Sequence, residues 1–309
     1  MKVAAVVPPA SLNLGNDFFA EGGMECFRQV FSDHDLDMRY IEFFDSGENG
    51  FHPFDGQTPY FTPATLNWIK NEADLIVLFA GCALHEGQRH LFQPLLDTGV
   101  PFIGWGLSPT SYNDSDVKFA KEIADKSLAL ITRDDVIGKL VGEYPNFISG
   151  MDGGWWMGDS YKRPDRATDY TVINIEEGNS LNVGQSLAKY DELKAQGKTV
   201  YMVSNNCERN DHYMHPGSLL ISSARHLYTT FANAEHVITT RAHTTICCLT
   251  NGVPVEYVGH LDYRTRGLMA TVGVDLAKLE TYDPEEIKVS VDISKKEFID
   301  LVKSKVELG

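Results

Sequence analysis

The sequence predicts an α/β protein made of two Rossmann-like lobes, each built around a parallel sheet. Short apolar runs such as 3–7 and 74–79 alternate with segments of helical periodicity, the pattern of parallel strands buried on both faces. A stretch rich in glycine and tryptophan interrupts this alternation at 150–166, after which the alternation resumes. A chain of 309 residues is also long enough for two domains of ordinary size.

The first lobe is assigned to residues 1–150. Its first strand, 3–7, leads into a helix at 17–31, where large apolar side chains recur at helical spacing. Four further strands are expected at 38–44, 74–79, 101–105 and 128–132, with helices at 62–71, 86–97, 114–126 and 134–142. Asp114 and Asp134 each open one of these helices and are predicted to be N-caps.

The connection between the lobes is assigned to 151–168 and the second lobe to 169–309. Its strands are expected at 170–175, 199–204, 237–240 and 254–258, with helices at 185–195, 217–231, 242–250 and, in the tail, 294–306. In open parallel sheets, ligands bind at the carboxyl ends of the strands. The residues that directly follow each strand are therefore the ones to consider for a site.

The charge balance excludes several kinds of partner. The chain carries 27 Lys and Arg against 43 Asp and Glu, for a net charge of −16. Such a surface repels nucleic acid and anionic membranes, because both bind clustered basic side chains. A small anionic ligand would have to bind in a locally positive pocket.

The sequence also predicts a cytoplasmic protein without a membrane span. The apolar run at the N-terminus covers only about six residues, too few for a signal peptide, and nothing approaches the ~18 apolar residues of a spanning helix. The five cysteines are odd in number and include no C-x-x-C pair. Free thiols in a reducing compartment are the simplest interpretation. The sequence does not indicate an oligomeric state.

Residues 201–270 have an unusual composition. This window contains no lysine, but it holds five arginines, six of the ten histidines and only five acidic residues. Arginine without lysine suits bidentate recognition of phosphate or carboxylate. Surface salt bridges are the alternative explanation.

Arg241 and His243 lie in this window, where a predicted strand meets a predicted helix. The backbone N–H groups of a helix start, one guanidinium group and one imidazole make an anion site there. His243 is a candidate for binding phosphate or for acid–base chemistry. The alternative is a histidine that caps the helix and an arginine paired with an acid.

The turn after the first strand holds polar candidates. Asn13, Gly15 and Asn16 allow a tight turn into the first helix, but they lack the three spaced glycines of a dinucleotide site. Asp17 is either the N-cap of that helix or an acid that faces the ligand.

Two later strand ends add further candidates. Gly81, in the small-residue loop after the third strand, allows a ligand to approach the backbone. Glu86 follows in the same loop and either reaches an acceptor or lies in solvent at a helix start. Arg133 directly follows the fifth strand and is placed to reach toward a ligand.

The connection contains Asp152 and the adjacent Trp155 and Trp156. The tryptophans either stack on a sugar or pack between the lobes. No metal site is expected, because no set of Cys and His residues has zinc spacing. The sequence also contains no P-loop and no G-x-S-x-G motif.

Taken in order, these segments resemble the polysaccharide pyruvyl transferase family. The similar segments are Asn-x-Gly-Asn at 13–16, the strand and small-residue loop at 74–84, LITRD at 130–134, the aspartate at 150–152, and R-x-H, a helix and G-x-P within 237–259. Arg264 lies where the family often carries a basic residue. Two departures from the family pattern are Cys82 and Ala83, which replace glycines, and the absence of the usual serine after Asp134.

The resemblance implies a fold like that of the two-lobed (GT-B-like) glycosyltransferases. It also implies that phosphoenolpyruvate donates its three-carbon unit to two hydroxyls of a sugar, giving a pyruvate ketal and phosphate without a metal or organic cofactor. The expected partners are thus a small anionic donor and a saccharide acceptor.

The resemblance also suggests roles for the candidate residues. Arg241 and His243 are expected to bind the phosphate, and Arg264 or Arg133 the carboxylate. The remaining candidates are Asp17, Glu86 and Asp152 as acids or bases, Trp155 or Trp156 as a stacking surface, and Asn13, Gly15, Asn16 and Gly81 in substrate binding.

Two other functions remain open from the sequence. One is a nucleotide-sugar glycosyltransferase of the same architecture, which needs an acidic residue for the nucleotide on the second lobe, where Glu256 is the obvious candidate. The other is a non-catalytic protein that binds saccharides or anions. Fold alone does not separate these functions, because function resides in the site.

Overall fold

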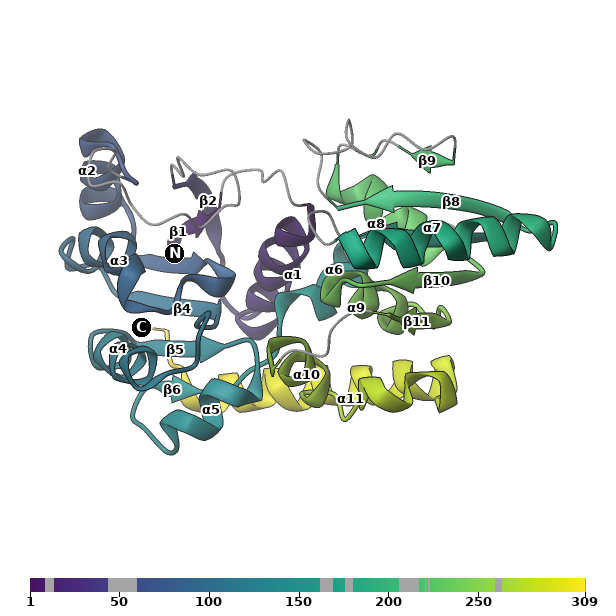
Figure 1. Ribbon diagram of the computed structural model, residues 1–309. Coiled ribbons are helices and arrows are strands. Elements are labelled where there is room, and N and C mark those ends of the chain that lie inside the picture. Colours follow the sequence, from purple (N-terminus) through teal and green to yellow (C-terminus); the bar gives the residue numbers. More distant parts are fainter. Residues whose placement is uncertain are drawn as a thin grey trace.

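The computed structural model describes residues 1–8, 14–43, 60–161, 169–175, 180–205, 217–219, 221, 223–258 and 263–308. Within these residues the chain forms two lobes, each with a parallel sheet at its centre (Figure 1). The predicted architecture of two Rossmann-like lobes is confirmed.

The sheet of the first lobe has six parallel strands in the order β2-β1-β3-β4-β5-β6. They are β1 (Lys2–Val7), β2 (Asp37–Glu42), β3 (Leu75–Phe79), β4 (Phe102–Leu107), β5 (Ala129–Thr132) and β6 (Phe147–Ile148). Every residue of β3, β4 and β5 is buried, as expected for strands covered on both faces. Strand β6 was not predicted, because two residues are too few to produce a periodic pattern.

The sheet of the second lobe has five parallel strands in the order β11-β10-β7-β8-β9. They are β7 (Tyr170–Ile175), β8 (Thr199–Ser204), β9 (Ser218–Leu219), β10 (His236–Thr239) and β11 (Val255–Tyr257). The prediction of a helix from residue 217 was wrong, because β9 lies there and the helix begins only after Ser223. The Ser223 hydroxyl accepts a hydrogen bond from the backbone N–H of His226 and so caps that helix.

Helices follow most of the strands. The α-helices are α1 (Leu14–Val30), α2 (Pro63–Glu72), α3 (Arg89–Leu96), α4 (Asp114–Asp125), α5 (Asp135–Val141), α6 (Met157–Ser160), α7 (Ser180–Ala195), α8 (Ala224–Ala232), α9 (Ala242–Thr250), α10 (Tyr263–Ala270) and α11 (Pro284–Lys305). Short 3₁₀ turns are η1 (Gly81–Ala83), η2 (Glu86–Gln88), η3 (Gly153–Trp156) and η5 (Leu276–Thr281).

Of the three aspartates considered as helix N-caps, one is a cap and two are not. Asp134 caps α5, because its carboxylate accepts hydrogen bonds from two backbone N–H groups of the first turn. The cap of α4 is Asn113 rather than Asp114, since Asn113 forms a reciprocal capping box with Asp116. Asp17 is not a cap, because α1 begins three residues earlier.

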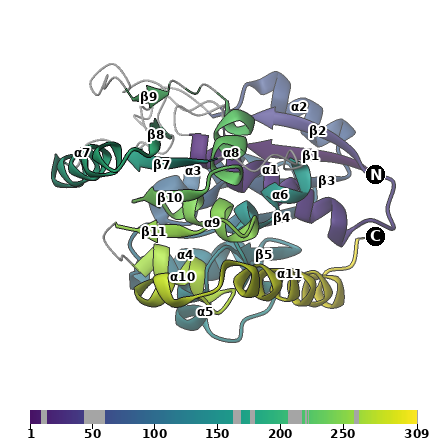
Figure 2. The same cartoon turned by 90° about the vertical axis from the view of Figure 1, so that its right-hand side faces the viewer.

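The last helix joins the two lobes. Figure 1 shows α11 running beneath both of them, and the chain ends on the first lobe, where it also begins (Figures 1 and 2). Phe298 of α11 packs against Trp105 of β4 and Trp156 of η3, with ring centroids 6.3 and 5.5 Å apart. The tail helix, predicted to belong to the second lobe, therefore contributes to the core of the first as well.

Candidate active site

Arg133 lies at the centre of a buried polar cluster between the lobes. It follows β5, and its side chain is only 5% exposed. Its Nε donates to Ser108 Oγ at 2.7 Å, its Nη2 to Cys82 Sγ at 2.8 Å, and its Nη1 lies 3.5 Å from Asp152 Oδ2. These partners follow β4, β3 and β6, so four neighbouring strands of one sheet meet at this guanidinium group. The structure thus brings Arg133, the candidate expected at a strand end, together with Asp152, the candidate from the connection.

Asp152 connects this cluster to the second lobe. Its side chain is fully buried, and Oδ1 accepts a hydrogen bond of 2.8 Å from the N–H of Gly154, which caps η3. Oδ2 lies 3.5 Å from His243 Nε2 and 3.5 Å from Arg133 Nη1. Burial raises the pKa of Asp152, but His243, Arg133 and the Gly154 N–H outweigh burial and hold the pKa below its usual value. The carboxylate is therefore ionised at neutral pH.

His243 comes from the first turn of α9, which follows β10 of the second lobe. Its side chain is 16% exposed, and its ring lies beside Phe19 of α1, with centroids 6.0 Å apart. The Nε2 atom is buried and makes no hydrogen bond within the described residues. It lies 3.5 Å from Asp152 Oδ2, a contact that is an ion pair only when the imidazole is protonated. An imidazole held in this way can turn a nitrogen toward a ligand.

Arg264 brings a second guanidinium group from the second lobe. It lies in α10, which packs against α5, and its Nη1 is 3.7 Å from Cys82 Sγ. Cys82 is partly buried, and one arginine from each lobe lies beside its sulfur. The cluster then holds two guanidinium groups and one imidazole near the carboxylate of Asp152, in a chain of net charge −16.

Asp134 and Tyr112 form a polar pair next to the cluster. The Tyr112 hydroxyl donates to Asp134 Oδ2 at 3.0 Å, while Oδ1 caps α5. Burial raises the pKa of Asp134 above its usual value, and Arg133 and the capping hydrogen bonds oppose that shift. Burial also raises the pKa of Tyr112. From the sequence, Asp134 was expected only as a helix cap, and Tyr112 was not among the candidate residues.

A buried amide fixes the start of α9. Asn174, at the carboxyl end of β7, accepts hydrogen bonds from the hydroxyls of Thr239 and Thr244 at 2.8 and 2.7 Å. Its Nδ2 donates to Asn205 Oδ1 at 2.9 Å, and the backbone carbonyl of Asn205 accepts from the first N–H of α1. This network ties the phosphate-binding candidates of α9 to the first helix of the other lobe. Sequence reasoning missed it, although a lone Asn in an apolar strand was a usable signal.

Arg241 occupies the N-cap position of α9. Its backbone N–H donates to Thr239 Oγ1 at 2.9 Å, and its carbonyl accepts from the Thr245 hydroxyl. The predicted placement of this residue at a strand-to-helix junction is confirmed.

The first turn of α1 and the loop after β3 hold the smaller candidates. Gly15 and Asn16 lie in α1, whereas Asn13 lies outside the described residues. Gly81 has φ of +49° and lies against Phe19, so a side chain there would meet both strain and a clash. Asp17 lines a separate hollow of about 610 Å³ on the α1 surface together with Glu21, Glu25, Glu42 and Asp159. The structure thus places Asp17 among other acids and not in the Arg133 cluster.

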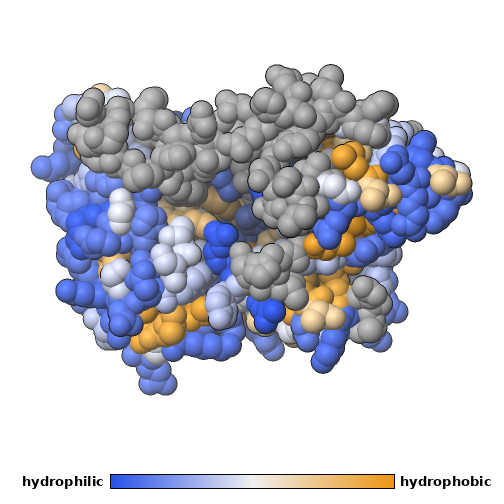
Figure 3. Space-filling view, viewed as in Figure 1, coloured by the Kyte–Doolittle hydropathy of each residue, from blue (hydrophilic) through white to orange (hydrophobic). Residues whose placement is uncertain are grey.

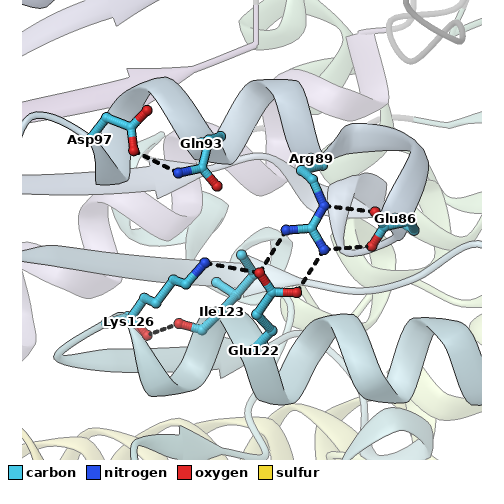
Figure 4. Close-up of polar contacts among 8 residues, drawn as sticks. Glu86, Arg89, Gln93, Asp97, Glu122, Ile123 and Lys126 are labelled. Atoms are coloured by element: carbon cyan, nitrogen blue, oxygen red, sulfur yellow. Dashed lines mark hydrogen bonds and ion pairs between the residues drawn. The ribbon is translucent and has the colours of Figure 1, made fainter.

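Glu86 lies on the surface and not in the cluster. Both of its oxygens accept hydrogen bonds from Arg89, which also holds Glu122 of α4 (Figure 4). These hydrogen bonds hold the pKa of Glu86 below its usual value. Sequence-based reasoning proposed an acid or base here because the residue follows a strand, but the following helix directs it to solvent, where it is 56% exposed.

Trp155 and Trp156 are fully buried in η3. Trp156 contacts Phe298 of α11, and the ammonium of Lys295 lies 5.6 Å from its ring centroid. Neither indole presents a face to a sugar in this structure, so the packing alternative describes them correctly and the stacking role does not fit. The connection thus packs against α11, which lies far along the chain. The composition of the connection alone could not predict this contact.

None of the helices in the described parts of the chain is long and apolar enough to span a membrane. Across the same residues, no group of three or more His, Cys, Asp or Glu side chains is arranged to hold a metal ion. The expected cytoplasmic location stays a prediction.

The fold and the interlobe cluster define a two-lobed α/β protein of the GT-B-like kind. The solved structures that it resembles include the S. aureus MnaA protein with UDP (TM-score 0.55, 9% identity, covering 98% of this chain and 96% of that one) and the UDP-GlcNAc 2-epimerase of Neisseria meningitidis bound to UDP-GlcNAc (TM-score 0.55, 10% identity, 98% and 100%). The UDP-GlcNAc 2-epimerase of Methanocaldococcus jannaschii with UDP-GlcNAc and UDP is similar too (TM-score 0.55, 9% identity, 98% and 100%). Identities this low show a common fold only.

The sequence profile of the polysaccharide pyruvyl transferase family matches residues 13–262. The match covers most of the chain, so this protein belongs to that family. A search of curated proteins found no matching sequence.

Proposed function

We propose that this protein transfers the pyruvyl unit of phosphoenolpyruvate to a saccharide and forms a pyruvate ketal. The observation that carries the proposal is the convergence of Arg133, His243 and Arg264 on one buried site between the lobes. Phosphoenolpyruvate carries a phosphate and a carboxylate, and a site with two forked guanidinium groups and an imidazole matches both. Membership of the family supports the same reaction.

The reaction requires proton transfers that the site can supply. The methylene carbon of phosphoenolpyruvate gains a proton, a sugar hydroxyl adds to the neighbouring carbon, and the second hydroxyl displaces phosphate to close the ketal. Each hydroxyl loses one proton, one of which balances the proton on carbon and the other leaves with phosphate. The reaction as written needs neither a metal nor an organic cofactor.

His243 is the acid–base group that we assign to these transfers, and Asp152 positions it. Asp152 is buried and ionised, so it orients the imidazole rather than donating a proton itself. Arg133 and Arg264 bind the carboxylate, and Arg241 with the N-terminal turn of α9 binds the phosphate. Gly15, Asn16 and Gly81 border the same interlobe region through α1 and η1 and would approach the substrates through their backbone.

The first test is thermal melting of the purified protein with phosphoenolpyruvate, phosphate, UDP or GDP. A ligand at one hundred times its Kd stabilises a folded protein by about 2.7 kcal/mol. We expect a shift with phosphoenolpyruvate that exceeds the shift with phosphate and that shrinks in both Arg264→Gln and Arg241→Lys. The matched control is Arg39→Gln, which removes the same charge from an exposed residue of β2.

The alternatives make different predictions in this test. A nucleotide-sugar enzyme would be stabilised by UDP or GDP and not by phosphoenolpyruvate. Its candidate acid, Glu256, lies beside His236 in a hollow of about 430 Å³ at the amino ends of β10 and β11, away from the interlobe cluster. A non-catalytic binding protein would be stabilised by phosphoenolpyruvate but would release no phosphate when saccharides are added.

A further inference from the structure

The junction between β10 and α9 contains two buried polar atoms that have no hydrogen-bond partner. Thr240 directly follows β10 and is 6% exposed, and its Oγ1 makes no hydrogen bond within the described residues. His243 Nε2, in the first turn of α9, also lacks a hydrogen bond there, although it lies 3.5 Å from Asp152 Oδ2. Buried polar groups in proteins are nearly always hydrogen-bonded, because an unmade hydrogen bond destabilises the fold. Two such atoms at one junction point to a ligand.

The hydroxyls next to Thr240 are already used inside the protein. Thr239 Oγ1 donates to Asn174 Oδ1 at 2.8 Å and accepts from the backbone N–H of Arg241 at 2.9 Å. Thr244 Oγ1 donates to the same Asn174 oxygen at 2.7 Å. These hydrogen bonds explain why the chain has threonines at those positions. They leave the buried hydroxyl of Thr240 without an explanation inside the fold.

The alternation of side chains along β10 separates Thr240 from the Asn174 network. Val237 belongs to the core cluster that contains the buried residues of α9, whereas Ile238 belongs to the cluster with Tyr190 of α7. Successive side chains of a strand point to opposite faces of its sheet. Thr239 therefore lies on the α9 side, as its hydrogen bonds show, and Thr240 lies on the α7 side.

The strand order places this junction at a position where ligands bind in open α/β sheets. In the order β11-β10-β7-β8-β9, the chain leaves β7 in one direction and returns to β10 on the other side of β7. Ligands bind beyond the carboxyl ends of the strands at such a reversal. Because α7 and α9 cover opposite faces of this sheet, the crevice at the reversal lies between their starts. Thr240 borders it from the α7 side of β10.

The start of α9 borders the same crevice. The first backbone N–H groups of a helix have no acceptor within the helix, and the Arg241 side chain does not cap them. They carry the positive end of the helix dipole, which favours a bound anion. Figure 3 shows the molecule hollowed between the lobes on the face drawn in Figure 1.

We propose that Thr240 is a phosphate ligand, whose hydroxyl donates a hydrogen bond to a phosphate group held at the N-terminus of α9. Phosphate suits this position because its several oxygens accept hydrogen bonds from a hydroxyl, backbone N–H groups and an imidazole at once. Thr240 thereby selects a donor that carries phosphate over one that carries only a carboxylate. That the phosphate belongs to phosphoenolpyruvate rests on the proposed function.

Thr240→Val tests the proposal, because it replaces the hydroxyl by a methyl group in a side chain of the same shape. The affinities of the full chain for inorganic phosphate and for phosphoenolpyruvate are measured by isothermal titration calorimetry. We expect both to fall by roughly tenfold or more, the effect of one hydrogen bond to a charged group. Thr240→Ser keeps the hydroxyl and should retain most of the affinity.

Thr230→Val is the matched control in the same lobe. It makes the same change in α8, where the hydroxyl donates to the backbone carbonyl of His226. It should leave both affinities unchanged.

The melting temperature without ligand separates a binding role from a structural one. Removing a buried hydroxyl that has no partner removes its desolvation cost, so Thr240→Val should melt at the wild-type temperature or above it. A hydroxyl that supports the fold predicts a lower melting temperature instead. Wild-type phosphate affinity in Thr240→Val would overturn the proposal. So would a loss of affinity that comes with a lower melting temperature and that Thr240→Ser does not restore.

The two ligands distinguish this proposal from the proposed function. A loss of affinity for both in Thr240→Val supports both. A phosphate affinity that falls in Thr240→Val, in a protein that does not bind phosphoenolpyruvate, supports the phosphate ligand and contradicts the proposed donor. Phosphoenolpyruvate binding that is equal in wild type and Thr240→Val overturns only the role of Thr240. A wild-type protein that binds neither ligand overturns both.

Discussion

Asp152 is the acidic residue that contacts side chains of both lobes. Its carboxylate pairs with Arg133 of the first lobe and His243 of the second. Asp152→Asn keeps an oxygen for the Gly154 N–H but leaves the buried Arg133 without this carboxylate. Removing one partner of a buried ion pair costs about 3–5 kcal/mol, so we expect a loss of that size in urea unfolding at pH 7. Phosphate release from phosphoenolpyruvate should fall as well, because His243 loses its orienting partner.

A second prediction at the residue scale concerns how the loss of unfolding free energy in Asp152→Asn depends on pH. The pKa of Asp152 in the folded protein lies below its usual value, so its ionisation stabilises the fold at pH values above ~4, the pKa of an aspartate in an unfolded chain. That contribution is lost as the pH falls through the lower, folded pKa. The gap in unfolding free energy between wild type and Asp152→Asn should therefore narrow on acidification. A gap that is constant between pH 7 and pH 3 would contradict this account.

Glu86 provides the opposite case. It is paired with Arg89 on the surface, where ion pairs contribute between about 0 and 1 kcal/mol. Glu86→Gln should thus change the unfolding free energy by less than about 1 kcal/mol. It should also leave the proposed pyruvyl transfer at the wild-type rate, measured as phosphate release from phosphoenolpyruvate. A large drop in turnover with an unchanged melting temperature would return Glu86 to the catalytic candidates.

The sequence predicts part of this site for a clear physical reason. Arg133 was identified because it follows a predicted parallel strand, and such strands carry site residues at their carboxyl ends. Asp152 was identified from its place in the connection between the lobes. The convergence on Cys82 and Ser108 could not be predicted, because it depends on the order β3-β4-β5-β6, which long-range packing determines. Glu86 was a wrong candidate for a related reason, because the position of a residue after a strand does not fix the direction of its side chain.

At the scale of elements, α11 is the helix on which the arrangement of the lobes depends. Phe298 is 5% exposed and packs on Trp105 and Trp156 of the first lobe. Earlier in the same helix, Ile287 and Val291 are buried in the core cluster that also contains Leu249 of the second lobe. The sequence-based prediction covered only its last turns, from residue 294, although Ile287 and Val291 extend the apolar face at helical spacing and Asp283 and Pro284 mark the start.

Phe298→Ala tests this role of α11. Truncating a buried phenylalanine costs about 3–5 kcal/mol, and we expect that loss in chemical denaturation. Ile293→Ala is the matched control, because Ile293 is 54% exposed on the same helix and its truncation should change stability by no more than about 0.5 kcal/mol. Equal effects of the two substitutions would show that α11 does not bury the face that the structure assigns to it.

For the whole molecule, the decisive feature is a hydrophobic core that crosses the boundary between the lobes. One cluster of buried side chains includes Val77 and Ile103 of the first sheet, Val172 and Val237 of the second, and Val302 of α11. A core shared in this way resists unfolding of one lobe without the other, whereas independent domains unfold in separate steps. The contact between Asp152 and His243 lies at the same boundary.

We therefore expect a single unfolding transition in scanning calorimetry, with a calorimetric enthalpy equal to the van't Hoff enthalpy. Phe298→Ala should shift this transition to lower temperature without splitting it, since the loss falls on contacts that both lobes share. Phosphoenolpyruvate should raise the same transition as a unit, because its proposed ligands come from both lobes. Two separated transitions in the wild-type protein, with only one sensitive to Phe298→Ala, would mean that the lobes are held together by their connection and not by a common core.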